Sequence, residues 1–280
     1  MSGIVLLTGA TGFVGRYLLQ ELTSRGCQVR AIVRKGKEAA LGNVRGIESL
    51  VSTPDLFAMD TAWWASACEN VDTVIHAAWY VKAGQYLTSP TNLDCLVGTL
   101  QLAKGAAQAK VSRFVGIGTC FEYDLARGVV TVETPLRPRT PYAATKASAF
   151  MALAQFFPYQ EVKFAWCRLF YLYGDGEHEQ RLVPYLHRML KAGQTAEITD
   201  GDQVRDFLDV REAARMVVEV ALSNEIGGVN ICSGIPITVR QLAEQVADHY
   251  GRRDLLRFGS RRGDRFDPPY VVGAVGKCDR

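Results

Sequence analysis

The sequence lacks any hydrophobic run long enough to cross a membrane. The apolar stretch within Met1–Gly15 runs directly into glycines and falls far short of the roughly 18 apolar residues that a spanning helix needs. No basic leader of the kind found in secretory signals precedes it. We therefore expect a cytoplasmic protein with no membrane partner.

The sequence also lacks cysteine motifs and a strong charge of either sign. Its seven cysteines are scattered, with no CxxC pair and no Cys/His cluster at metal-ligand spacing, so we expect reduced thiols and no metal site. A net charge of +3 is too small for a typical nucleic-acid-binding protein. The excess is local, since residues 251–280 hold seven Arg and one Lys against four Asp. This tail is either a solvated surface or a site for an anionic ligand.

Short apolar runs alternate with helix-like segments along the chain. The runs at 3–10, 27–36, 71–81, 112–123, 162–174 and 227–234 have the composition of buried parallel strands. Segments 12–26 and 89–111 between them have helical patterns. Repeated strand–helix–strand order predicts an α/β fold, a doubly wound parallel sheet (Rossmann fold) with helices on both faces. Ligands of such sheets bind at the carboxyl ends of the strands.

A glycine turn follows the first expected strand and precedes a helix. Gly9 permits a tight turn, Gly12 lets the backbone approach a pyrophosphate, and Gly15 allows close packing of helix and strand. The helix N-terminus adds free N–H groups and positive potential. The pattern predicts a dinucleotide site, although three glycines could also serve a turn alone. The spacing is GxxGxxG rather than GxGxxG.

The end of the second expected strand predicts which dinucleotide binds. The sequence there is Val33-Arg34-Lys35, with no acidic residue to accept hydrogen bonds from a free ribose. Arg34 can stack on adenine and pair with a 2′-phosphate, and Lys35 adds charge. We therefore expect NADP(H) to be preferred, with NAD(H) possible. The alternative is a pair of solvated side chains at a strand end.

Residues 140–148, "TPYAATKAS", predict a helix that begins with a Thr140 cap and Pro141 in the first turn. Tyr142 and Lys146 are four residues apart and share one face of this helix. The pair could transfer protons, or the segment could be an alanine-rich helix with a surface lysine. The spacing alone does not decide between these interpretations.

Several motifs in a fixed order carry a family resemblance. They are the glycine turn, "HAAW" after the fourth strand, Asn92, the Tyr142/Lys146 pair, "RLFYLYG", "RLVPYLHRMLKAGQ", "DGDQVRDFLDVREAARMV" and "NICSG". The chain resembles extended short-chain dehydrogenases/reductases, the NAD-dependent epimerase/dehydratase family, which act on nucleotide sugars. The resemblance implies a dinucleotide-binding domain at 1–170, to which 208–233 returns. It implies a smaller substrate-binding region at 171–207 and 234–280.

The resemblance also implies a catalytic set of Thr119, Tyr142 and Lys146. Lys146 would hold the nicotinamide ribose and lower the pKa of Tyr142, which exchanges a proton with the substrate oxygen. Thr119 would hydrogen-bond the same oxygen. The cofactor contacts so implied are Gly9, Thr11, Gly12, Phe13, Val14, Gly15, Arg34, Lys35, Ala77, Ala78, Asn92, Tyr142 and Lys146.

The residues after Thr119 narrow the reaction. Related sugar dehydratases carry Asp-Glu there, whereas this chain has Cys120-Phe121, so dehydration is not expected. Cys120 is either a buried, inert thiol or the counterpart of a cysteine that epimerising relatives use together with a histidine in a later loop. The matching loop position here is Arg181, and His178, three residues away, could substitute for the histidine. The remaining options are NADPH-dependent 4-ketoreduction, as in CDP-abequose synthase, 4-epimerisation with tightly held NAD, and a regulator that binds NADP without chemistry.

Three arginines are candidates to bind the diphosphate of a nucleotide sugar. Arg205 and Arg261 match contacts of the family, and Arg181 is a third candidate. Arg205 could instead form a salt bridge to Asp206 or Asp209. Cys120 and Thr119 are the remaining expected substrate contacts. The resemblance further implies a homodimer through a four-helix bundle of the helices near 92–109 and 142–157.

Overall fold

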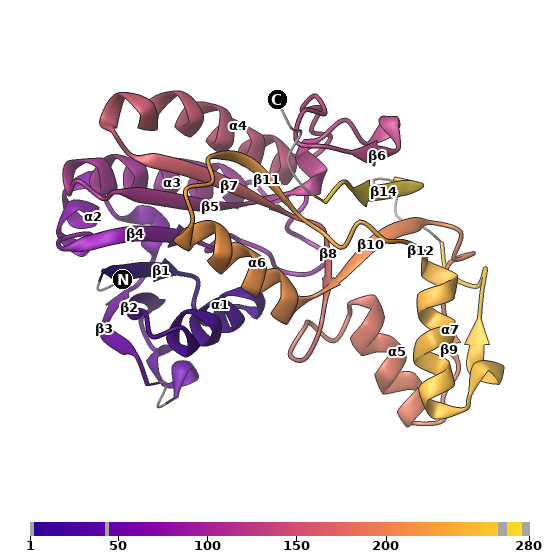
Figure 1. Cartoon of the computed structure of the whole chain (residues 1–280). Coiled ribbons are helices and arrows are strands. Elements are labelled where there is room, and N and C mark those ends of the chain that lie inside the picture. Colours follow the sequence, from indigo (N-terminus) through magenta and orange to yellow (C-terminus); the bar gives the residue numbers. More distant parts are fainter. Residues whose placement is uncertain (1–2, 43–44, 263–267, 276–280) are drawn as a thin grey trace.

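A computed structural model describes residues 3–42, 45–262 and 268–275, and its centre is a parallel sheet of seven strands (Figure 1). The strands are β1 (Ile4–Thr8), β2 (Gln28–Arg34), β3 (Ile47–Thr53), β4 (Val71–His76), β5 (Arg113–Thr119), β7 (Lys163–Leu169) and β11 (Gly227–Ile231). Their order is β11-β7-β5-β4-β1-β2-β3, and every neighbouring pair is parallel. The chain moves outward in one direction from β1 and in the other from β4. The expected doubly wound Rossmann fold is confirmed.

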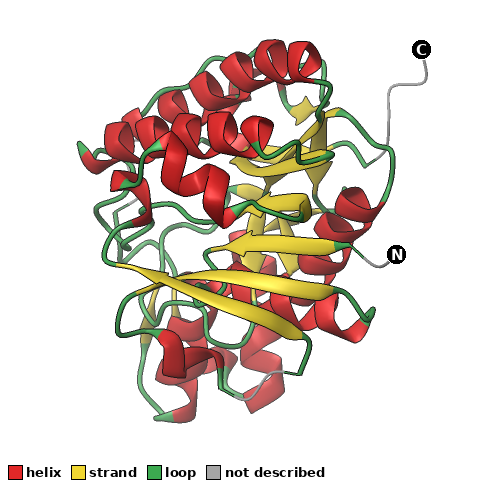
Figure 2. Ribbon diagram, turned by 90° about the vertical axis from the view of Figure 1, so that its left-hand side faces the viewer, coloured by secondary structure: helices red, strands yellow, loops and turns green. Residues whose placement is uncertain are grey.

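Helices cover both faces of this sheet, and Figure 2 shows them in red on either side of the yellow strands. One layer contains α1 (Phe13–Ser24) and α6 (Val210–Leu222), which pack on each other. The other contains α2 (Thr61–Ala67), α3 (Thr91–Gln108) and α4 (Pro141–Phe156), with α3 between its neighbours. Two apolar cores fill the spaces between sheet and helices, one on each face. Burial of these faces stabilises the central sheet.

A smaller group of elements lies beside the carboxyl edge of the main sheet, at the right of Figure 1. It contains β6 (Val129–Val130), β8 (Tyr171–Tyr173), β10 (Val204–Asp209), β12 (Pro236–Thr238) and β14 (Tyr270–Gly273), which form a mixed sheet. It also contains α5 (Leu182–Lys191), β9 (Ala196–Glu197), α7 (Val239–Tyr250) and β13 (Leu256–Arg257), which share a separate apolar core. Strand β6 joins this sheet although it lies within 1–170. The division into a dinucleotide-binding and a substrate-binding region remains a prediction.

Local sequence explains where the site-bearing helices begin and how closely they pack. Helix α4 begins as expected, because the Thr140 hydroxyl accepts a hydrogen bond from Ala143 N at 3.2 Å and Pro141 follows the cap. Helix α3 approaches α2 closely at Gly105, where a Cβ would lie 2.5 Å from Trp64 Cβ. Trp64 is fully buried between these helices. The packing fixes the helices from which the expected Tyr142, Lys146 and Asn92 project.

Candidate active site

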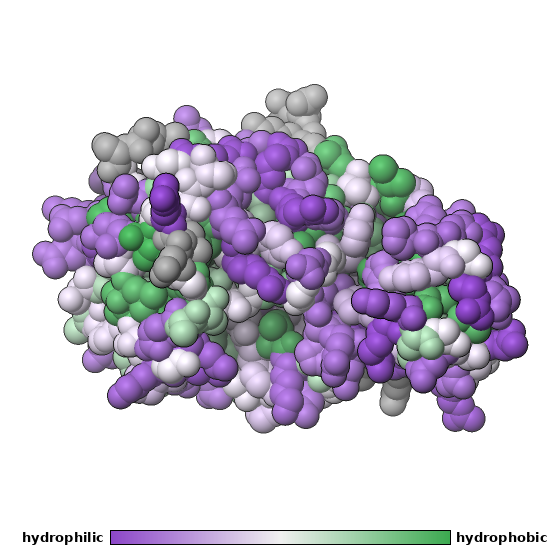
Figure 3. Space-filling model, turned by 90° about the horizontal axis from the view of Figure 1, so that it is seen from below, coloured by the Kyte–Doolittle hydropathy of each residue, from purple (hydrophilic) through white to green (hydrophobic). Residues whose placement is uncertain are grey.

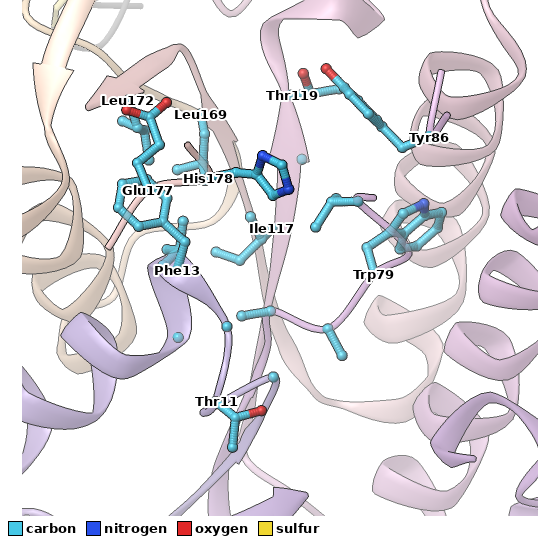
Figure 4. Close-up of a pocket in the computed structure, with 18 of the residues that line it drawn as sticks. Thr11, Phe13, Trp79, Tyr86, Ile117, Thr119, Leu169, Leu172, Glu177 and His178 are labelled. Atoms are coloured by element: carbon cyan, nitrogen blue, oxygen red, sulfur yellow. The ribbon is translucent and has the colours of Figure 1, made fainter. Parts of the chain in front are cut away.

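A cavity of about 670 Å³ opens at the carboxyl edge of the main sheet. The turn after β1, the end of β2, the loop after β4, the end of β5 and the segment that follows β7 line it. Figure 4 shows Trp79 and Tyr86 on one wall, and Phe13 and Glu177 on the opposite wall. The cavity lies where a doubly wound sheet binds its ligands.

The glycine turn forms one end of the cavity. Gly9 has φ +76°, and a Cβ there would lie 2.8 Å from Ala78 N. A Cβ at Gly15 would lie 1.9 Å from Gly9 O, so this position also requires glycine for packing. A Cβ at Gly12 would meet only Gly9 O, at 3.2 Å, and would otherwise project into open space. The protein itself therefore does not demand glycine at position 12, which fits close approach of a bound phosphate.

The first turn of α1 is suited to an anion. Its N-cap is Gly12, which supplies no side-chain cap, and the first turn contains no acidic residue. The free N–H groups of this turn therefore face the cavity end where Thr11, Phe13 and Val14 lie. These residues fit the diphosphate of a dinucleotide.

Basic side chains lie at the other end of the cavity, where β2 ends. Arg34 and Lys37 line the cavity there. Lys35 is exposed and lies outside the lining, and its backbone N–H donates to Thr53 O at 2.9 Å. Among the described residues that line the cavity, Glu177 is the one carboxylate, and it lies on the wall formed after β8. The end of the cavity beside β2 is therefore basic, with Arg34 in the lining and Lys35 outside it.

Thr119 and Tyr142 meet inside the cavity. Thr119 is the last residue of β5, and Tyr142 lies in the first turn of α4. Burial raises the pKa of the Tyr142 phenol above its ordinary value, and the Thr119 hydroxyl has a smaller, opposite effect on it. Burial therefore favours the protonated phenol, the form that can donate a proton.

Lys146 is buried on the same helix, with 3 % of its surface exposed. Its Nζ donates to Ile117 O at 2.6 Å and lies 3.8 Å from the centroid of the Trp79 ring. The ammonium thus binds a carbonyl and lies against an indole face in this structure. Burial is the largest cause of the raised pKa of Tyr142, and the expectation that Lys146 lowers this pKa remains a prediction.

The remaining predicted site residues lie at different depths. Ala77, Ala78, Cys120 and Arg181 line the cavity, whereas Asn92 does not. Asn92 is fully buried and binds the protein itself, by accepting from Trp79 Nε1 at 2.8 Å. Burial raises the pKa of the Cys120 thiol, as expected for an inert cysteine.

Two of the three arginines expected to bind substrate lie outside the cavity lining. Arg205 is 2 % exposed, and its guanidinium lies 5.0 Å from the Tyr171 ring centroid. Asp206 binds Ser233 and the backbone of residues 234 and 273. Arg261 is exposed and lies after β13. Arg181 is the arginine of this set that reaches the cavity.

Comparison with known proteins identifies the family. Residues 5–232 match the family described as NAD dependent epimerase/dehydratase. The chain belongs to this family. As a member it is an enzyme of the oxidoreductase, epimerase and dehydratase group, and its Rossmann fold is that of its relatives.

Three relatives show the extent of the similarity. The dTDP-6-deoxy-L-talose 4-dehydrogenase (NAD(+)) of Aggregatibacter actinomycetemcomitans is 28 % identical over 251 residues, 88 % of this chain and 90 % of the relative. CDP-abequose synthase of Salmonella typhimurium is 26 % identical over 228 residues, 77 % of this chain and 69 % of the relative. A solved structure, MoeE5 in complex with UDP-glucuronic acid and NAD, superposes with a TM-score of 0.80 at 28 % identity, covering 98 % of this chain and 90 % of MoeE5.

In this epimerase/dehydratase enzyme, the segment after Thr119 places no carboxylate in the cavity. Cys120 and Phe121 line it. The next residue, Glu122, is fully buried, and it accepts hydrogen bonds from Thr119 N at 2.9 Å and Arg168 Nε at 2.7 Å. The carboxylate closest in sequence to Thr119 is therefore bound to the protein and lies outside the cavity lining.

Sequence reasoning assigned no role to Trp79, Tyr86 or Glu177, and all three line the cavity. Tyr86 packs edge-to-face on Tyr142, with centroids 4.9 Å apart, and its hydroxyl points toward Thr119 in Figure 4. Burial raises the pKa of Glu177 to about 7. The sequence did contain a signal for Trp79, because "HAAW" places it directly after β4, at the carboxyl edge of the sheet. Tyr86 and Glu177 lie on loops without a recognisable pattern.

The described part of the chain contains neither a metal-binding cluster nor a helix that could span a membrane. No group of three or more His, Cys, Asp or Glu residues is placed there to hold a metal ion. No described helix has the length and apolar character needed to span a bilayer. Six cysteines are free and buried. The seventh, Cys278, lies outside the described residues.

Proposed function

We propose that the enzyme reduces the C4 keto group of a 4-keto-6-deoxy nucleotide sugar with NADPH, a step of deoxysugar biosynthesis. The observation that carries this proposal is that Thr119 and Tyr142 both line the cavity that begins at the glycine turn, with the Thr119 hydroxyl close enough to affect the Tyr142 phenol. Two hydroxyl groups at one point can hold one carbonyl oxygen and give it a proton. A keto sugar is a substrate whose reduction needs both actions.

The residues of the chain divide the work of this reaction. The first turn of α1 would hold the diphosphate of NADPH, which would supply the hydride, and Arg34 would bind near the adenosine of this cofactor. Thr119 fixes the substrate oxygen by a hydrogen bond. Tyr142 gives its proton to that oxygen, and its raised pKa keeps the proton in place until the oxygen becomes basic. Lys146 supplies positive charge behind the phenol.

The absence of a free carboxylate beside Thr119 favours reduction over dehydration. Elimination of water needs an acid and a base besides the tyrosine. Cys120 has a raised thiol pKa, Phe121 cannot transfer protons, and Glu122 is bound to Arg168. The described cavity wall near Thr119 therefore holds the groups for one proton transfer to a carbonyl.

The preference for NADPH is supported by Arg34 at the cavity end. The relatives support a second candidate, because MoeE5 was solved with NAD and the talose 4-dehydrogenase is named for NAD(+). That candidate is a 4-epimerase that retains NAD and recycles it. A regulator without chemistry is disfavoured, since it would have no use for Tyr142 and Lys146.

We further propose that a nucleotide diphosphate group enters beside Arg181, which lines the cavity. Arg205 and Arg261 would contribute from the substrate-binding region at 171–207 and 234–280.

A homodimer would form through α3 and α4, which expose Leu93 and Met151 with 61 % and 53 % of their surfaces accessible. On the lower face in Figure 3, by contrast, apolar side chains form only small areas among hydrophilic ones. Measurement of the molecular mass in solution tests the proposed dimer. We also propose a cytoplasmic location, with which the buried free cysteines agree.

NADPH oxidation against a panel of 4-keto-6-deoxy nucleotide sugars tests the proposal. The panel carries CDP, GDP, dTDP and UDP, and each sugar is also offered with NADH. We expect stoichiometric NADPH consumption with one nucleotide. Conversion of a 4-hydroxy nucleotide sugar to its epimer without net cofactor consumption would instead establish the epimerase.

A further inference from the structure

The surroundings of the Lys146 ammonium are almost entirely apolar. Nζ donates one hydrogen bond, to Ile117 O at 2.6 Å, although an ammonium has three N–H donors. The Trp79 ring lies 3.8 Å from Nζ and the Trp166 ring 5.7 Å, measured to the centroids. Burial lowers the pKa of Lys146 well below that of an exposed lysine. The charged form of Lys146 therefore depends on neighbouring groups that replace the hydration lost on burial.

The ionisable neighbours of Lys146 offer limited compensation. Burial lowers the pKa of His76 on β4 to about 3 and raises that of the Cys95 thiol on α3 to about 11, so both are neutral at pH 7. Tyr142, on the same helix as Lys146, is neutral as well. Glu122 raises the pKa of Lys146 but is itself bound to a buried arginine. The face of an indole is the remaining electron-rich partner.

Contacts with Asn92 and Phe57 hold the Trp79 indole so that its face stays against the Lys146 ammonium. Its Nε1 donates to Asn92 Oδ1 at 2.8 Å, and Phe57 packs edge-to-face on it at 6.3 Å between centroids. Asn92 is fully buried, and its Nδ2 donates to Tyr86 O at 2.6 Å and Ser89 O at 2.9 Å. Rotation of the indole would leave Asn92 Oδ1 without this donor in a buried place. The ring orientation is therefore fixed from behind.

We propose that Trp79 is a positioning residue that keeps the Lys146 ammonium charged and in place at the cavity wall, and that Asn92 orients the Trp79 ring. This role rests on the proposed function only in that Lys146 serves catalysis. It assigns to Asn92 a place behind the site, in contrast to the cofactor contact expected from sequence. A cation over an indole face is stabilised most where water is excluded, as it is here.

Titration of the Lys146 side chain in the cofactor-free protein tests this role directly. Lysine labelled with ¹³C at Cε reports ionisation by NMR, and the Lys146→Arg protein identifies the signal. We expect Trp79→Leu to lower the pKa of Lys146 by about one unit, and Trp79→Phe, which retains a ring face, to restore most of it. Trp63→Leu removes a tryptophan on α2 outside the cavity lining and should leave this pKa unchanged.

Two results would overturn the role. One is a Lys146 pKa in Trp79→Leu equal to that of the wild type. The other is an equal shift in the Phe and Leu variants, which would show that side-chain volume and not the ring face matters. Trp79→Met fills more of the space with a flexible apolar chain and gives the same test if the Leu variant does not fold. Circular dichroism and thermal unfolding establish that each variant is folded.

A second readout links the role to turnover. Charged Lys146 is lost as pH rises through its pKa, so the high-pH limb of kcat/KM should move to lower pH in Trp79→Leu and return in Trp79→Phe. An unmoved limb in both variants contradicts the role. If the wild type reduces no nucleotide sugar, the proposed function fails, whereas the NMR titration still decides whether Trp79 holds the ammonium.

Discussion

The buried ion pair between Glu122 and Arg168 gives the sharpest prediction about stability. Their side chains are 0 % and 1 % exposed, and Arg168 Nε lies 2.7 Å from Glu122 Oε2. Glu122 also accepts hydrogen bonds from Thr119 N at 2.9 Å and Trp166 Nε1 at 3.0 Å. Substitution of Glu122 by Gln would leave the guanidinium charge uncompensated inside the protein.

We expect Glu122→Gln to lower the free energy of unfolding by about 3–5 kcal/mol, the usual cost of breaking a buried pair on one side. The amide keeps the shape, but its NH₂ group would face other donors. Arg168→Met should cost a similar amount. The double variant removes both charges, so its loss should fall short of the sum of the single losses by about 2–3 kcal/mol.

Urea unfolding at pH 7, followed by circular dichroism, measures these values by linear extrapolation. Arg215→Met is the matched control, since Arg215 pairs with Glu212 on an exposed surface of α6 where both side chains are more than 40 % accessible. It should change stability by less than about 0.5 kcal/mol. A loss below about 1 kcal/mol in Glu122→Gln, or full additivity in the double variant, would refute the reasoning.

Two further predictions concern charges in the cavity. Arg34→Ala should raise the Kd for NADPH, measured by fluorescence titration, far more than the Kd for NADH, because the guanidinium binds the 2′-phosphate. Lys35→Ala is the control, since Lys35 lies outside the cavity lining, and it should change both Kd values little. Equal increases in the two Kd values of Arg34→Ala would contradict this prediction. Burial raises the pKa of Glu177 to about 7 from its ordinary value of about 4.5, so the protonated form favours folding. Stability should therefore fall as the pH rises from about 4.5 through 7. Glu177→Gln lacks this loss, so its Tm relative to wild type should rise between pH 5 and pH 8, and a difference in Tm that does not change with pH would disprove the assignment.

The fold, the glycine turn and the start of α4 could be predicted because they depend on local sequence. The Gly9 conformation and the close packing at Gly15 are dictated by a turn between neighbours in the chain. The start of α4 follows from Thr140 and Pro141 in the same way. Such features need no knowledge of distant segments, so a single sequence contains them.

The substrate end could not be predicted because it depends on how distant segments meet. Arg205 lies under Tyr171 because β10 pairs with β8, and no pattern in either strand shows this. Asn92 was expected to contact the cofactor, but it lies fully buried in the first turn of α3, where it accepts a hydrogen bond from Trp79 Nε1. The direction of the Lys146 ammonium likewise follows from where that indole lies.

The central claim is that Tyr142 transfers the proton in this site, and the Tyr142→Phe variant tests it most directly. This substitution removes one hydroxyl and keeps the ring that packs on Tyr86. Turnover of the 4-keto sugar and the Kd for NADPH are measured on the same preparation. The account predicts that turnover falls by about 100- to 10,000-fold while the Kd for NADPH stays nearly unchanged. Turnover that persists near the wild-type rate would contradict it.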